Sequence, residues 1–131
     1  MHLHAGCDPP RRRIMMMMMM IIFGVFPNAS NAEILLNNLS EADFDLSDVS
    51  VVMRTSKQRN AFAQDCGPLK GATMSNLSEK LLRSGLPTEA CDLYREALLD
   101  GKVLVAMHVT PETRDAAKEM FEDQSAELIK E

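Results

Sequence analysis

The chain has 131 residues, of which 46% are hydrophobic and 25% charged, so its length and composition fit a single globular domain with a modest core. Its net charge of −5 argues against general nucleic-acid binding, and no apolar run reaches the roughly 18 residues that a membrane-spanning helix needs. Three cysteines without paired spacing predict no disulfide framework, which favours a reducing compartment.

The N-terminal stretch has two interpretations. Three arginines precede an apolar run that extends from Ile14 to Phe26 and includes six consecutive methionines, and small residues follow at Ser30 and Ala32. A positive flank, a short apolar run and small residues are the pattern of a secretory signal peptide, so residues 1–32 could direct export.

The other interpretation places the natural start at Met20 or at one of the methionines just before it, so that residues 1–19 form a disordered leader or an upstream extension. Residues 20–26 then form a first strand, and the Ser-Asn-Ala-Glu sequence at 30–33 is a capping box for a helix over 29–41. A signal peptidase would cut within the first turn of that helix. We therefore expect a strand at 20–26, with the signal peptide as the alternative.

A second strand is predicted at 49–54, so that strand, helix and strand form a βαβ unit with a right-handed crossover. The next segment, 54–85, is a basic insert with six basic residues against two acidic ones. Its glycines and polar runs predict a partly irregular chain with a short helix over 75–83. Because Phe62 is the one aromatic residue of this insert, no nucleic-acid partner is expected.

A helix, a turn and a strand are predicted next. Apolar residues recur at three- and four-residue spacing within a helix over 87–99, which Gly101 ends. The following run, Val-Leu-Val-Ala-Met, is apolar on both faces and predicts a central buried strand over 102–109. A Thr-Pro pair then marks the start of a last helix over 111–124, and residues 125–131 are expected to fray.

Together these elements predict an α+β fold for residues 20–131, taken as one domain. The expected sheet is small and ferredoxin-like, with about three strands, a βαβ-α-αβα order and helices mainly on one face. The uncovered face or an open sheet edge would favour the pairing of two chains, so a homodimer is expected.

Two motifs carry a resemblance to a known family. They are Gly24-Val25-Phe26, which ends the first strand, and Gly85-Leu86-Pro87, which is followed by Tyr94 and the strand after Gly101. Over residues 21–53 and 85–124, the chain resembles bacterial general stress proteins with the heat-induced stress protein domain. Typical members have a long Gly/Ala-rich apolar segment where this chain has the basic insert, so the role of that segment is not carried over. The resemblance implies a fold and a stress-related context but no catalytic residues.

Three residues are candidates for chemistry. His108 ends the third predicted strand and could act as a base, although no acid or nucleophile stands at a spacing that implies a partner. Cys66 has basic residues near it in the sequence, which would lower the pKa of its thiol. Tyr94 could offer a hydroxyl to a cleft, but its position in the apolar stripe of its helix favours the core.

No metal, cofactor or catalytic residue is expected. His2, His4 and Cys7 have a spacing that could bind a transition metal, but they fall in the expected leader. No glycine-rich phosphate loop, carboxylate pair or catalytic triad spacing is visible, which favours a non-enzymatic role.

The expected function is that of a cytoplasmic, stress-associated protein that acts through protein contacts or self-association, without stable membrane insertion. A first alternative is a module that binds a small molecule or metabolite on the uncovered sheet face. A second is an enzyme with a site around His108 and Cys66, and a third is a protein exported through residues 1–32.

Overall fold

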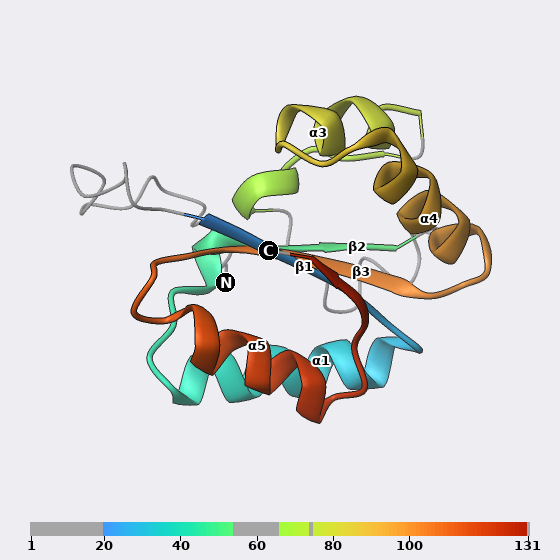
Figure 1. The fold of residues 1–131 in the computed structure, drawn as a ribbon. Helices are drawn as coiled ribbons and strands as arrows, with labels where there is room; N and C mark the ends of the chain where they lie inside the picture. The colour runs from blue at the N-terminus through green and yellow to red at the C-terminus, as the bar shows by residue number, and fades with distance from the viewer. Residues whose placement is uncertain (1–19, 54–65, 74, 131) are drawn as a thin grey trace.

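The computed structural model describes residues 20–53, 66–73 and 75–130. Four strands form one antiparallel sheet, and helices pack on both of its faces (Figure 1). The α+β class predicted from the sequence is confirmed, whereas the expected count of about three strands is wrong. Within the described residues, no helix is long and apolar enough to cross a membrane.

The strand order in the sheet is β2-β3-β1-β4. The strands span Met20–Phe26 (β1), Val49–Val52 (β2), Val103–Val109 (β3) and Glu127–Lys130 (β4). β3 lies between β1 and β2 and is antiparallel to both, so β1 and β2 run in the same direction without being neighbours. The predicted βαβ unit is therefore split by a third strand. The apolar run of β3 lies inside the sheet and is buried, as predicted.

β4 forms where the sequence predicts a frayed end. It pairs with β1 through Phe23 opposite Lys130 and Val25 opposite Glu127, with an irregularity between these two pairs. Leu128 lies in that irregular part and has a φ of 54°, so the strand bulges there. The sequence Glu-Leu-Ile-Lys shows little alternation of apolar and polar residues. It forms a strand because it can pair with the edge of β1.

Two helices, α1 (Ala29–Glu41) and α5 (Arg114–Asp123), cover one face of the sheet (Figure 1). Their apolar sides pack on alternate residues of the strands, and the rings of Phe26 and Phe121 lie 5.4 Å apart between centroids. Gly24 makes this approach possible, because a β-carbon built on it would lie 2.7 Å from Cδ2 of Phe121. This first core includes Ile22, Phe26, Leu35, Leu39, Val105, Met107 and Phe121.

The opposite face of the sheet is covered by α3 (Leu77–Arg83), α4 (Thr88–Leu99) and the short helix η4 (Gly67–Leu69) (Figure 1). The expectation of helices mainly on one face is therefore wrong. The physical reason is that the strands are apolar on both faces, so each face needs a layer of cover. The second core includes Phe23, Val25, Leu69, Leu77, Leu81, Tyr94, Leu98 and Leu104.

Several element boundaries also differ from the prediction. β2 ends at residue 52 rather than 54, and α3 begins at 77 rather than 75. α5 begins at 114 rather than 111, because Thr110 and Thr113 form a turn in which the Thr110 N–H donates to Oγ1 of Thr113 at 2.9 Å. α1 has the predicted bounds, but Asn28 caps it by accepting from the N–H of Asn31 at 3.1 Å. The predicted capping box at Ser30 is therefore wrong.

From Cys66 onward, the basic insert packs against the sheet. Ser50 of β2 is buried, and its hydroxyl donates to the carbonyl of Cys66 and accepts from the N–H of Leu69 at 2.7 Å. Gly67 adopts a φ of +73° with its α-carbon close to the backbone of Asp48 and β2. Residues 54–65 and the expected leader at 1–19 lie outside the described residues, as do the metal candidates His2, His4 and Cys7.

Candidate functional site

His108 lies at the end of β3, with 30% of its side chain exposed. Asp48, the residue that immediately precedes β2, lies beside His108, because Val49 pairs with Met107 in the register of β2 and β3. His108 Nδ1 and Asp48 Oδ1 are 3.9 Å apart, which is close enough for charge interaction but too long for a direct hydrogen bond. Asp48 is the last residue of η3, the short helix Leu46–Asp48, and its side chain is almost fully buried.

Burial of His108 outweighs the effect of Asp48 and favours the neutral form of the imidazole. Burial lowers the pKa of His108 from its ordinary value, and the nearby Asp48 carboxylate only partly opposes that shift. A neutral imidazole carries one N–H donor and one nitrogen acceptor, so His108 can both donate and accept a hydrogen bond at this site.

His108 and Asp48 line a pocket of about 240 Å³ at the edge of the sheet. Its lining combines carboxylates, hydroxyls and apolar side chains. Thr110 and Thr113 contribute hydroxyl groups that lie 3.1 Å apart. The other lining residues are Asp43, Phe44, Asp45, Met107 and Val109. Among the residues that the structure describes, no group of three or more histidine, cysteine, aspartate or glutamate side chains is placed to hold a metal ion.

Cys66, the second candidate, lies away from the pocket lining and precedes η4. It is buried, with 2% of its surface exposed, and it takes part in a disulfide. A sulfur in a disulfide is not a free thiolate, so the proposed activation of this cysteine by nearby basic residues does not apply in this structure. The disulfide also differs from the sequence-based expectation of reduced cysteines, because an odd count of cysteines says nothing about which of them approach one another.

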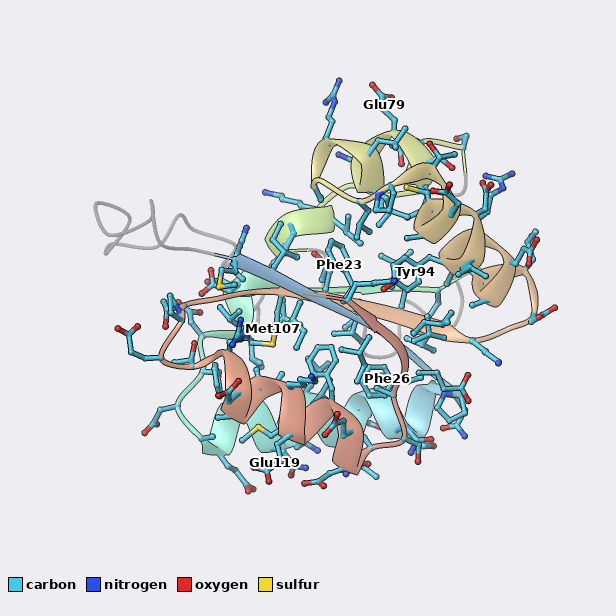
Figure 2. All side chains as sticks on the ribbon, viewed as in Figure 1. Phe23, Phe26, Glu79, Tyr94, Met107 and Glu119 are labelled. Carbon is cyan, nitrogen blue, oxygen red and sulfur yellow. The ribbon has the colours of Figure 1, made fainter. Side chains whose placement is uncertain are left out.

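Tyr94, the third candidate, is a core residue of α4. Its ring stacks on Phe23 with centroids 6.0 Å apart, as Figure 2 shows, and 1% of its surface is exposed. The hydroxyl donates to the carbonyl of Leu128 at 2.5 Å and so ties α4 to the bulge of β4. Burial raises the pKa of Tyr94 well above its ordinary value. The structure therefore gives this hydroxyl a partner in the core rather than a place in a cleft.

The three candidates are thus not brought together. His108 alone lines the pocket, and its neighbours Asp48, Thr110 and Thr113 are residues that sequence reasoning missed. A signal for Asp48 existed, because a polar residue immediately precedes one predicted strand and His108 ends another. Antiparallel pairing of these two strands would have placed their polar ends side by side.

Comparison with protein-family models, with curated proteins and with solved structures finds no match for this chain. The functional argument therefore rests on the geometry of the described residues, and the resemblance to the general stress proteins stays a prediction.

Proposed function

We propose that this protein is a non-enzymatic module that binds a small molecule in the pocket beside His108. The observation that carries the proposal is the mixed lining of that pocket, in which a neutral imidazole, carboxylates and paired hydroxyls surround apolar side chains. Binding pockets have this composition, with a few polar groups that orient a ligand over an apolar surface.

The lining also narrows the class of ligand. Ionised carboxylates only accept hydrogen bonds, and the His108 ring adds one acceptor and one donor. A ligand that donates hydrogen bonds, such as an amine or an amide with a short apolar group, matches this set. The volume of about 240 Å³ lies below the common range for drug-sized ligands, so the ligand is small.

The proposal is tested by NMR titration of the full chain with three probes: butylamine, ethanolamine and acetamide. At least one probe should produce saturable shifts at His108, Thr110 and Thr113. His108→Gln should weaken those shifts, whereas Glu79→Gln, at an exposed position on α3, should leave them unchanged. No saturable shift with any probe, or saturable shifts confined to residues outside the pocket, would refute the proposal.

A second candidate function is action through protein contacts, including a homodimer, in the stress-related context that the resemblance implies. The specific observation in its favour is a group of leucines exposed on helices α3 and α4. This second proposal includes the prediction that the protein resides in the cytoplasm. Export through residues 1–32 is the alternative to residence in the cytoplasm. The mass of the protein from its native host would separate the two, because export through residues 1–32 removes that segment.

We also propose that the fold is ferredoxin-like, with η4, α3 and α4 inserted between β2 and β3. Two features support this assignment: the antiparallel strand order β2-β3-β1-β4, and the position of α1 and α5 together on one face of the sheet. The split βαβ unit formed by β1, α1 and β2 belongs to the same motif.

A further inference from the structure

The outer surface of α3 and α4 exposes more large apolar side chains than the other helical layer does. Leu82, Leu93 and Leu99 are exposed by 48%, 45% and 48% of their surfaces. On the layer of α1 and α5, the only exposed large apolar side chain among the described residues is Ile34, at 45%. Large apolar side chains that are half exposed on one helical layer indicate a contact surface where they form a continuous patch.

The charges of the two layers differ as well. α1 and α5 together carry six acidic residues and two basic ones, so two copies of this layer would repel each other. α3 and α4 together carry four acidic residues and three basic ones, which is close to balance. Glu79 of α3 and Glu119 of α5 point away from the sheet on opposite sides of the molecule (Figure 2).

Within the balanced layer, the two helices have opposite charge. α3 contains Lys80 and Arg83 against one acid, Glu79; because Glu79 pairs with Arg83 within the helix at 2.8 Å, the net positive charge of α3 lies on Lys80. α4 contains three acids against one base, Arg95, and two of these acids, Glu89 and Asp92, lie in its first half. A twofold arrangement that sets α3 of one copy against α4 of the other therefore brings opposite charges together twice, once on each side of the axis.

We infer that this protein forms a homodimer through the outer surface of α3 and α4, with α3 of each copy against α4 of its partner. Leu82 then meets Leu93 of the opposite α4, and the burial of these two side chains supplies the apolar part of the contact. This surface differs from the one expected from the sequence, because both sheet faces are already covered within one chain. The inference rests on the second candidate function, action through protein contacts, and not on ligand binding beside His108.

The test is sedimentation of the full chain over concentrations from about 1 μM to about 1 mM, with and without substitutions. Leu82→Lys and Leu93→Lys should each raise the dimer dissociation constant by about tenfold or more, because each places a charge in an apolar contact. Ile34→Lys, at an equally exposed position on the opposite layer, is the matched control and should have no effect. Circular dichroism of every variant shows whether it is folded.

Charge reversal tests the arrangement of the two helices. Lys80→Glu should weaken the dimer, and combining it with Asp92→Lys should restore the affinity, since the two changes exchange the signs of facing helices. A strict monomer at every concentration overturns the inference. So does a dimer that only Ile34→Lys disrupts, or one in which the double reversal is no tighter than Lys80→Glu alone.

Discussion

Replacing Tyr94 with phenylalanine should destabilise the protein by about 1 to 2 kcal/mol while leaving its fold intact. The substitution removes one partly buried hydrogen bond, from the Tyr94 hydroxyl to the carbonyl of Leu128, and keeps the aromatic ring that stacks on Phe23. A typical hydrogen bond contributes about 1 kcal/mol, and the carbonyl that loses its partner adds a desolvation cost of similar size. Chemical denaturation of parent and variant measures the difference.

Burial of the Tyr94 hydroxyl also predicts how the stability of the folded protein changes at high pH. In the folded protein the pKa of Tyr94 is raised by burial, whereas in the unfolded chain it takes its ordinary value of about 10. A group whose pKa is raised in the folded state stabilises the fold fully below the unfolded pKa, and that contribution is lost as the pH rises above it. The loss amounts to about 1.4 kcal/mol for each pH unit above about 10.

The assay is direct because the chain has one tyrosine and no tryptophan, so tyrosinate absorbance reports Tyr94 alone. Tyrosinate should appear together with loss of the far-ultraviolet dichroism, and in denaturant it should appear near pH 10. Unfolding of the Tyr94→Phe variant should depend less on pH in this range, which separates Tyr94 from the lysines that titrate there too. Reversible tyrosinate formation near pH 10, with the dichroism unchanged, would refute the reasoning.

Three further predictions concern packing and charge. Gly24→Ala should cost about 1 to 3 kcal/mol in thermal unfolding because its methyl group collides with Phe121, and a variant as stable as the parent would contradict that contact. Ser50→Ala should cost about 1 to 3 kcal/mol in urea unfolding by leaving two buried backbone groups without their partner, and a neutral result would place that hydroxyl in water. The unfolding free energy should fall as the pH drops below about 6.5, since burial lowers the pKa of His108 and the unfolded chain binds the proton more readily. In an NMR titration, Asp48→Asn should lower that pKa further, and a rise would show that the carboxylate does not act on the ring.

The local sequence pattern was sufficient to predict an element where the whole signal lies within one segment. The strand at 20–26 and the helix at 29–41 have the predicted bounds, because alternation, apolar spacing and polar flanks act within a few residues. The covering of both sheet faces was also implicit in the sequence. β3 is apolar at successive positions, and a strand of that kind needs a layer on each side.

The features that were not predicted from the sequence depend on strand pairing between segments far apart in the chain. Glu127–Lys130 becomes a strand only because the edge of β1 is available, and nothing within those four residues encodes that partner. The contact between His108 and Asp48 follows from the antiparallel register of β2 and β3, which joins residues 60 positions apart in the numbering. The pocket could not be predicted for the same reason. Its lining comes from two segments, 43–48 and 107–113, that become neighbours only in the folded sheet.

The central position of β3 has a consequence for how this chain folds. Met20 pairs with Val109 and Phe26 with Val103, so the partners of β1 lie 77 to 89 positions further along the chain. Among the described residues, β2 pairs only with β3, so the strands that β1 and β2 pair with here are synthesised late, after most of the chain. Contacts of such long range are associated with slow folding, and the apolar strands β1 and β2 remain open to chaperones during synthesis.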